Sequence, residues 1–304
     1  IGFEELGAKA FDSIGDLVRA VPSLIRMRSW RTMLAMASRY FTDERLRTVF
    51  SFHPLLIGGN PCAVTCTYSL ITVLEERFGV HWAVGGTGAL VQGLVGLLQE
   101  RGVGLRFNSE VRRITVDGGR ANGVELANGE RLHADIVVSN ADTAWTYREL
   151  VDAPLRRHWT DKRLARAKHS MSLFVWYFGT NRRYDDVPHH QLLLGPRYEG
   201  LLTDIFKKQK LADDFSLYLH RPTATDASLA PEGCDAFYVL SPVPHLGSGT
   251  DWKAIGESYR QRLQQALEDT VLPGLGQHVV TSLVSTPEYF RDSLLAYKGA
   301  AFGL

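Results

Sequence analysis

Residues 81–142 read HWAVGGTGALVQGLVGLLQERGVGLRFNSEVRRITVDGGRANGVELANGERLHADIVVSNAD, and this stretch decides the fold. Two glycines, Gly85 and Gly86, precede apolar residues spaced by threes and fours, a pattern that predicts a helix with one buried face. We expect Thr87 to cap this helix and Gly102 to end it. The apolar residues of the predicted face are Leu90, Val91, Leu94, Leu97 and Leu98.

Three strand-like runs follow the helix: 111–116, 121–126 and 132–139. The turns between them, at 117–119 and 128–129, carry Asp-Gly-Gly and Asn-Gly, which are typical of hairpins. Residues 134–139 are apolar nearly throughout, which predicts a strand buried on both faces. The stretch therefore predicts a helix, a meander and a buried returning strand that breaks at 140–142.

This succession resembles the middle of the FAD-dependent amine-oxidase-like flavoproteins, in which a Gly-Gly pair opens a helix and a buried strand returns to the flavin. The resemblance implies that the backbone of Val111 meets the adenine of FAD. It also implies a set of cofactor-binding residues: Gly85, Gly86, Val111, Asn140, Ala141 and Asp142. An ordinary helix-plus-meander unit without a cofactor remains the alternative interpretation of the same spacing.

The composition bounds the class of protein. The 304 residues and 45% hydrophobic content suffice for one large or two ordinary domains. A net charge of +1 indicates no polyanionic partner such as nucleic acid. Three cysteines form no disulfide framework, and Cys62 and Cys66 lack a second ligand pair, so we expect no metal site and a reduced, cytoplasmic setting. No apolar run approaches the roughly 20 residues of a membrane span.

Residues 17–42 combine five arginines with no acidic residue, three methionines and several aromatic residues. A basic helix of this kind suits the surface of an anionic membrane. The alternative is a solvated arginine face on a helix that packs against its own core. In the same helical region, Asp16 and Arg19 are three residues apart and share one helical face.

After residue 142 the pattern becomes α+β. Expected strands are 172–178, 191–194, 215–220, 236–242 and 279–285, and expected helices are 199–206 and 252–271. In the second helix a core-facing stripe repeats every four residues: Ile255, Tyr259, Leu263, Leu267 and Val271. The aromatic strands predict a mixed-sheet substrate domain that lines an apolar cavity, with a simple packed sheet as the alternative.

Six motifs, in order and spacing, are similar to those of bacterial-type phytoene desaturases. They are FSFHPLLIGGNP at 50–61, GGTGALVQG at 85–93, VVSNAD at 137–142, GPRY at 195–198, the long block at 213–247, and FRDSLLAYKGAAF at 290–302. The sequence departs from that family at 82–84, where an aromatic residue, a proline and a basic residue are usual. This departure leaves a basic contact to the cofactor at Val84 unsupported.

The resemblance implies a partial FAD-binding domain of the Rossmann-like, glutathione-reductase type, a substrate domain and a helical membrane-facing segment. No G-x-G-x-x-G follows a strand in the chain, so we expect a central piece of a longer protein, inactive by itself. We expect four parts: a helical segment at 1–80, the partial FAD-binding domain at 81–142, the substrate domain at 143–286, and a return towards the FAD domain at 287–304. The side where the Gly-rich strand would pair is expected to be open.

The resemblance also implies an activity, the FAD-dependent desaturation of a linear carotenoid, most simply phytoene to lycopene. Asp16 and Arg19 match a family position, and we expect Asp16 to accept the proton and Arg19 to hold it ionised or to contact the flavin. The apolar substrate would enter from the bilayer, which places the protein at the inner face of the cell membrane, with oxygen or a quinone as the electron acceptor. Two alternatives stay open: an oxidoreductase of another carotenoid, and a redox-inactive module that binds apolar lipids.

Overall fold

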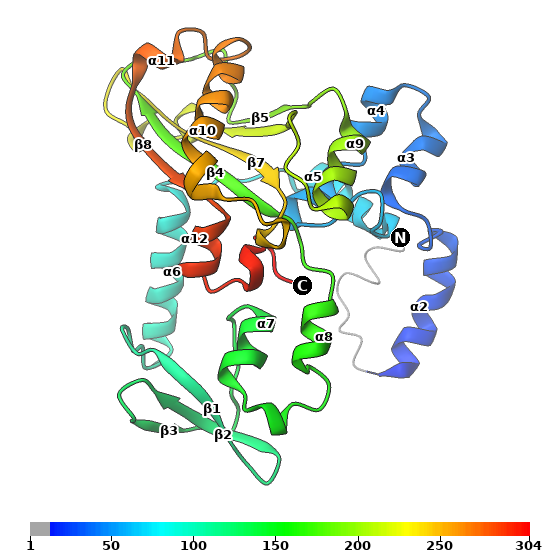
Figure 1. Ribbon diagram of the computed structural model, residues 1–304, viewed down its shortest axis with the longest axis vertical. Coiled ribbons are helices and arrows are strands. Elements are labelled where there is room, and N and C mark those ends of the chain that lie inside the picture. Colours follow the sequence, from blue (N-terminus) through cyan, green and yellow to red (C-terminus); the bar gives the residue numbers. More distant parts are fainter. Residues whose placement is uncertain (1–12) are drawn as a thin grey trace. The chain divides into compact units, whose positions relative to one another are not determined.

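The computed structural model describes residues 13–304, so the first twelve residues of the expected helical segment lie outside the described part. The described chain divides into two compact units. The helical unit comprises residues up to 81 together with 197–207, and the sheet unit comprises 82–196 together with 208–304. Figure 1 shows the elements of both units in the order of the chain. The expected division into four parts stays a prediction.

The helical unit confirms a mostly helical beginning over the described residues. Its α-helices are α2 (Ile14–Arg26), α3 (Met33–Tyr40), α4 (Glu44–Val49), α5 (Leu70–Phe78) and, from later in the chain, α9 (Tyr198–Thr203). Side chains of Ser13, Thr32 and Asp43 accept backbone hydrogen bonds at the beginnings of α2, α3 and α4, which satisfies amides that have no partner within the helix. No helix in residues 13–304 has both the length and the hydrophobicity to cross a membrane.

The sheet unit is built on five strands in the order β5-β6-β7-β4-β8. Their bounds are β4 (Ser172–Thr180), β5 (His190–Leu193), β6 (Leu217–His220), β7 (Asp235–Val243) and β8 (Val279–Ser285). The five expected strands are confirmed, but all pairings are antiparallel, so the expected mixed sheet is wrong. An antiparallel arrangement needs no long crossover between neighbours, and β6 is followed by β7 through a single loop.

One face of this sheet carries the core. Helix α10 (Trp252–Glu268) packs there, with α11 (Leu275–His278) after it and α12 (Pro287–Asp292) following β8 (Figure 1). The predicted stripe of α10 is confirmed, because Tyr259, Leu263 and Leu267 are buried in the same core cluster as the aromatic side chains of β4, and the Tyr259 ring contacts that of Phe174. The Tyr259 hydroxyl and the Ser241 hydroxyl hydrogen-bond each other at 2.8 Å, so this polar group is buried with a partner.

Helix α6 (Gly86–Glu100) forms where the sequence predicts it, but two details differ. Its cap is Gly85 rather than Thr87, and both Gly85 (φ +83°) and Gly86 (φ +82°) adopt the left-handed conformation that glycine tolerates best. The expected burial of its apolar face is wrong, since Leu90, Val91, Leu94, Leu97 and Leu98 are between 39% and 57% exposed. Within the described chain no other element covers this face.

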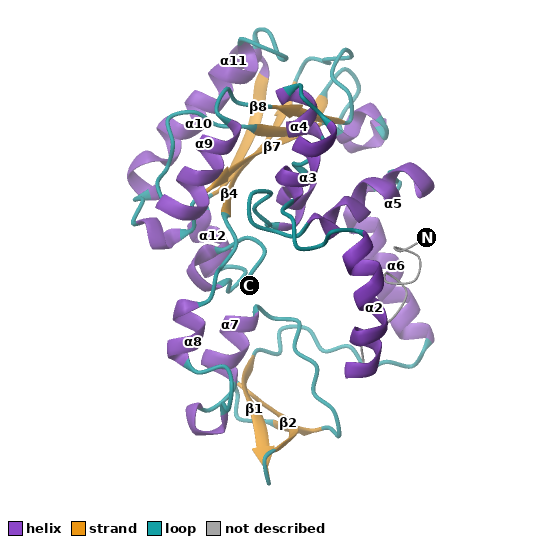
Figure 2. Cartoon of the chain, turned by 90° about the vertical axis from the view of Figure 1, so that its right-hand side faces the viewer, coloured by secondary structure: helices purple, strands orange, loops and turns teal. Residues whose placement is uncertain are grey.

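The meander is confirmed as β1 (Val111–Asp117), β2 (Arg120–Leu126) and β3 (Arg131–His133), a separate antiparallel sheet whose three strands are labelled in Figure 1 and whose first two are labelled in Figure 2. The prediction of a buried returning strand at residues 134–139 is wrong. The third strand ends at His133, and Ile136 and Val138 are 77% and 86% exposed. Burial on both faces requires layers on both sides, and residues 13–304 provide none there. Two short helices follow, α7 (Thr143–Trp145) and α8 (Asp161–Arg166).

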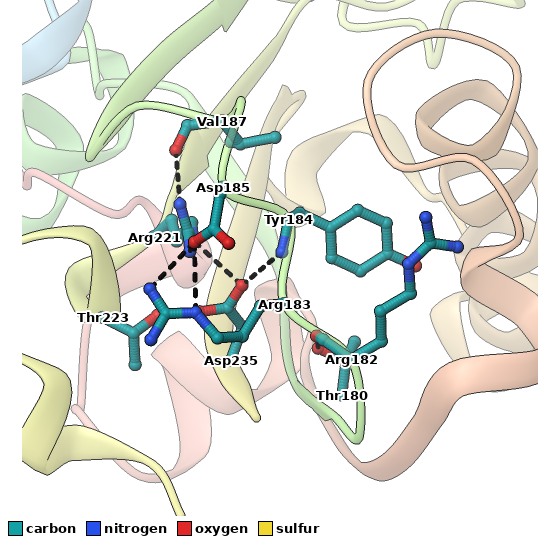
Figure 3. A network of polar contacts seen from close by, with 9 residues as sticks. All are labelled: Thr180, Arg182, Arg183, Tyr184, Asp185, Val187, Arg221, Thr223 and Asp235. Atoms are coloured by element: carbon teal, nitrogen blue, oxygen red, sulfur yellow. Dashed lines mark hydrogen bonds and ion pairs between the residues drawn. The ribbon is translucent and has the colours of Figure 1, made fainter. Parts of the chain in front are cut away.

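A buried ion pair holds the β5 edge of the large sheet (Figure 3). The Arg221 guanidinium, at the end of β6, donates from Nε to Oδ2 of Asp235 over 2.9 Å, and both residues are at most 2% exposed. Its other nitrogens donate to the carbonyl oxygen of Val187 at 2.9 Å and to Oδ1 of Asp185 at 3.1 Å. Every branch of the guanidinium therefore has a partner, as a buried charge requires.

The Asp235 carboxylate, at the start of β7, is equally satisfied. It accepts the backbone N–H of Tyr184 at 2.8 Å and the Thr223 hydroxyl at 2.7 Å (Figure 3). The backbone N–H of Arg221 donates to the carbonyl oxygen of His189 at 2.9 Å. Together these bonds fasten the turn 184–189, which leads into β5, to β6 and β7.

Removal of either side chain of the Arg221–Asp235 ion pair should therefore destabilise the folded protein. We expect Asp235→Ala to lower the free energy of unfolding by about 3–5 kcal/mol, because it removes the buried partner of Arg221 and leaves this buried charge with only the exposed Asp185 carboxylate. Urea unfolding of the purified protein, followed by circular dichroism, measures the change. The control is Glu130→Ala, which breaks the exposed ion pair with Arg106 and should leave the unfolding midpoint nearly unchanged. Equal midpoints for the two variants would contradict the assignment.

Candidate functional site

The face of the large sheet opposite α10 carries two rows of side chains that run across all five strands. Directly paired residues of neighbouring strands share a face, so the strand register identifies each row. The first row is His190, His220, Tyr238, Tyr177 and Leu283. The second row is Leu192, Tyr218, Leu240, Val175 and Ser285. We call the two rows together the open sheet face.

The open sheet face is apolar and aromatic, and its polar groups are hydroxyls and imidazoles. Neither row contains an acidic residue, a lysine or an arginine. The ring centroids of Tyr177 and Tyr238 lie 5.7 Å apart, and those of Tyr218 and Tyr238 lie 5.8 Å apart. Burial raises the pKa of each of these three phenols, so they are neutral. Such a surface suits a large apolar ligand with few polar contacts.

Three histidines gather at the β5 edge of this face: His189, His190 and His220, here called the histidine cluster. Their ligand nitrogens lie within 4.8 Å of one another. Burial lowers the pKa of His189 and His190, and it lowers the pKa of His220 to about 4, with a further contribution from the neighbouring His189 and His190. At neutral pH the cluster is therefore a group of neutral imidazoles.

The predicted cofactor glycines lie beside this cluster. The ring of Trp82 is 4.9 Å from that of His189 and 5.2 Å from that of His220. Three residues later, the backbone N–H of Gly85 donates to Oδ2 of Asp226 at 2.7 Å. The beginning of α6 is thus anchored to the loop that follows β6.

The glycine pair fits part of a flavin. Backbone with two left-handed glycines and no side-chain cap allows a ring to approach closely. However, hydrogen bonds from Ser228 and from the Gly85 N–H hold the pKa of Asp226 below its usual range, so this carboxylate is negative. A phosphate at the same amide would meet that charge. Gly85 and Gly86 therefore suit the uncharged ring system of FAD better than its diphosphate.

The structure does not gather all six predicted cofactor residues in one place. Val111 opens β1, beyond the C-terminal end of α6, and this helix of 15 residues is about 22 Å long (Figure 1). Asn140 and Ala141 are exposed, whereas Asp142 caps α7 through a 2.9 Å hydrogen bond from the Trp145 N–H. An extended dinucleotide can contact separated residues, and the cofactor roles of these positions stay predictions.

The predicted catalytic pair lies in the helical unit, on the first turns of α2. Arg19 Nη1 and Asp16 Oδ1 are 3.2 Å apart, and Oδ2 of Asp16 accepts the Ser13 hydroxyl at 2.7 Å. The Arg19 side chain is 82% exposed. A solvent-exposed ion pair contributes little to the free energy of unfolding, so the Asp16–Arg19 pair has no evident structural role. Its catalytic role stays a prediction.

Sequence reasoning missed the histidine cluster and the two rows. A weak signal was available, because His189 and His190 are adjacent and Tyr218 and His220 alternate along one strand. Alternation places Tyr218 and His220 on one face of β6. The alternation does not tell which strand lies beside β6. Only the register of the β5–β6 pair shows that His190 lies opposite His220.

Comparison with known proteins gives the family. The model of the family described as flavin containing amine oxidoreductase matches residues 27–270. The neurosporene-forming phytoene desaturase of Cereibacter sphaeroides is 46% identical over 100% of this chain and 59% of its own length. The lycopene-forming phytoene desaturase of Pantoea ananas is 44% identical over 100% of this chain and 62% of its own length. The expected resemblance to bacterial phytoene desaturases is confirmed.

Solved structures agree on the fold. An oxidoreductase from Methanosarcina mazei matches 90% of this chain and 61% of its own, with a TM-score of 0.59 and 18% identity. A putrescine oxidase variant, A394C, with redesigned cofactor binding matches 92% of this chain and 57% of its own, with a TM-score of 0.55 and 12% identity. These likenesses show an amine-oxidase-like fold with α/β content and antiparallel sheets.

The chain spans about 60% of the length of the curated relatives it matches. The expected cofactor, FAD, is confirmed by the family, whose members contain a flavin. By the match along most of its length, this chain belongs to the family of flavin containing amine oxidoreductases.

Proposed function

We propose that the complete protein catalyses the FAD-dependent desaturation of a linear carotenoid, with phytoene as substrate and lycopene as product. The observation that carries the proposal is the open sheet face, two uncharged rows of aromatic and aliphatic side chains across five strands. The relatives named as phytoene desaturases, which include neurosporene- and lycopene-forming enzymes, support the same substrate class.

A long linear polyene has no polar groups for hydrogen bonds or ion pairs, so shape and burial alone can hold it. Burial of each CH₂ group contributes about 0.8 kcal/mol, which makes an extended apolar surface sufficient for binding. Tyr177 and Tyr238 offer ring faces in the middle of the open sheet face, and their neutral hydroxyls add no charge. The flavin, when bound, takes the hydride equivalent from the substrate.

We propose that Asp16 receives the proton that leaves the neighbouring carbon, and that Arg19 keeps its carboxylate ionised. The ionised carboxylate is the form of an aspartate side chain that accepts a proton. The 3.2 Å distance between the two side chains supports the pairing. Oxygen or a quinone would then reoxidise the flavin.

We also propose that α2 docks on the inner face of the cell membrane, where the substrate resides, in a cytoplasmic protein. Four apolar residues spaced by four, three and four form one stripe along α2, and each is exposed: Ile14 (83%), Val18 (62%), Val21 (42%) and Ile25 (57%). Arg19 and Arg26 share a second face seven residues apart. An exposed apolar stripe beside arginines is typical of helices that lie in the interface of an anionic bilayer.

The activity is tested with the full-length protein, FAD, liposomes and phytoene. We expect phytoene to be consumed and a coloured polyene to appear, resolved by chromatography and absorption spectrum. Tyr177→Glu should lower turnover at least about tenfold with flavin still bound, because it buries a charge beside the substrate. The control is Ala254→Glu, an exposed position on α10, which should retain activity.

Two results would overturn this function. Oxidation of another carotenoid with phytoene untouched favours the related oxidoreductase, and a full-length protein without flavin absorbance favours the lipid-binding module.

The catalytic pair is tested in the same assay. Asp16→Ala and Arg19→Ala should each lower kcat at least about tenfold while FAD stays bound and the unfolding midpoint stays unchanged. Arg39→Ala, which removes another exposed arginine of the helical unit, serves as the control. Wild-type turnover in both variants would end the catalytic assignment.

Docking is tested by sedimentation with vesicles. The protein should bind vesicles rich in phosphatidylglycerol more tightly than phosphatidylcholine vesicles, with weaker binding at high salt. The double variant Val18→Asp, Ile25→Asp should lose binding, because it places two charges in the apolar stripe. Leu155→Asp, at an exposed position of the sheet unit, should bind like the wild type. Binding by the double variant at the wild-type level would exclude α2 as the contact.

A further inference from the structure

We propose that the histidine cluster binds a divalent transition-metal ion, with Zn²⁺ as the ion of choice. The proposal rests on the three imidazoles and their hydrogen bonds rather than on the flavin chemistry, and a bound ion would place its charge at the β5 end of the first row, where His190 and His220 lie. An imidazole set without carboxylates suits zinc, copper, nickel and iron, and it disfavours magnesium, calcium and manganese.

The fold brings the three rings together from separate places. His190 and His220 are direct partners across the β5–β6 ladder, and His189 precedes β5. Their ligand nitrogens lie within 4.8 Å of one another. Bonds of about 2.0–2.1 Å to a tetrahedral zinc ion place nitrogens about 3.3 Å apart. The exposed His190 ring and the half-buried His189 ring would have to rotate to supply this contraction.

His189 has a ring nitrogen with no partner. Its Nδ1 lies 2.5 Å from the Thr225 hydroxyl oxygen, and in a metal-binding ring this nitrogen would be the protonated donor. Its Nε2 is buried and has no hydrogen bond. A buried lone pair without a partner is costly, and a metal ion would satisfy it.

The Tyr218 hydroxyl orients the other two rings. Its oxygen lies 2.6 Å from Nδ1 of His190 and 3.0 Å from Nδ1 of His220. The Tyr238 hydroxyl donates a hydrogen bond to the Tyr218 oxygen, so Tyr218 donates its own proton to Nδ1 of one of the two rings and accepts the N–H of the other. The ring that donates from Nδ1 has the lone pair of its Nε2 available for a metal ion, and metal binding by the other ring requires the tautomer with its proton on Nδ1. The distal nitrogen of a histidine ligand usually donates to a carboxylate, a backbone carbonyl or water, and here a hydroxyl oxygen takes that place.

The backbone holds His189 close to His220, and the site leaves room for a further ligand. The bond between the Arg221 N–H and the His189 carbonyl ties His189 to the chain beside His220, next to the buried ion pair with Asp235. Three protein ligands leave a fourth position open, as in catalytic zinc sites. The Trp82 ring lies beside two of the histidines, and its Nε1–H is buried without a partner. This donor suits an oxygen ligand on the metal, such as water or a carboxylate.

The test uses the full-length protein, purified without a histidine tag and stripped with a chelator. Calorimetric titration with Zn²⁺ should show one ion bound per chain. His189→Ala and His190→Ala should each weaken binding at least about tenfold, whereas His158→Ala, an exposed histidine outside the cluster, should bind like the wild type. Because His190 is exposed, its variant should fold normally, and Zn²⁺ should raise the Tm of the wild type but not of this variant.

Tyr218→Phe separates a metal site from a chance cluster of imidazoles. It keeps all three rings and removes only the oxygen that orients two of them, so zinc affinity should fall about 10–100-fold. A wild-type protein that binds no stoichiometric zinc overturns the proposal. So does binding that is unchanged in both His189→Ala and His190→Ala.

Discussion

The buried ion pair between Arg221 and Asp235 is the constraint on which the rest of the sheet unit depends. A guanidinium and a carboxylate can be removed from water only if nearly every donor and acceptor finds a partner. Here those partners are the carbonyl of Val187, the Asp185 carboxylate, the Tyr184 amide and the Thr223 hydroxyl. Because each buried donor and acceptor of this pair needs a hydrogen-bond partner, the pair determines the path of the turn before β5 and the alignment of β5, β6 and β7.

That alignment gives the sheet two chemically distinct faces. One face carries Phe174, Trp176 and Phe178 against α10, and the other carries the two rows that we associate with the substrate. Because side chains alternate along a strand, a register shift of one residue would exchange the two sets. The same hydrogen bonds that stabilise the fold therefore also keep the aromatic rows on the open face.

Much of this architecture could be predicted from the sequence, and the limits have physical causes. The five strands and the stripe of α10 follow from local periodicity, which depends only on neighbouring residues. The burial of Leu94 or Val138 depends on what packs against it, and the described chain leaves both exposed. The histidine cluster depends on register between strands distant in sequence, so adjacent letters such as His189 and His190 could not reveal His220 as their neighbour. Motif resemblance indicated the family, but it gave no account of the Asp226 carboxylate at the Gly85 amide.

The first row also has a measurable extent. It crosses five strands at about 4.8 Å per step, so from His190 to Leu283 it covers about 19 Å. A rigid rod that lies along it would meet imidazoles at one end, phenol rings in the middle and a leucine at the other. The width of the sheet, which is set by the number of strands, therefore limits the length of a linear molecule that can contact the first row at one time.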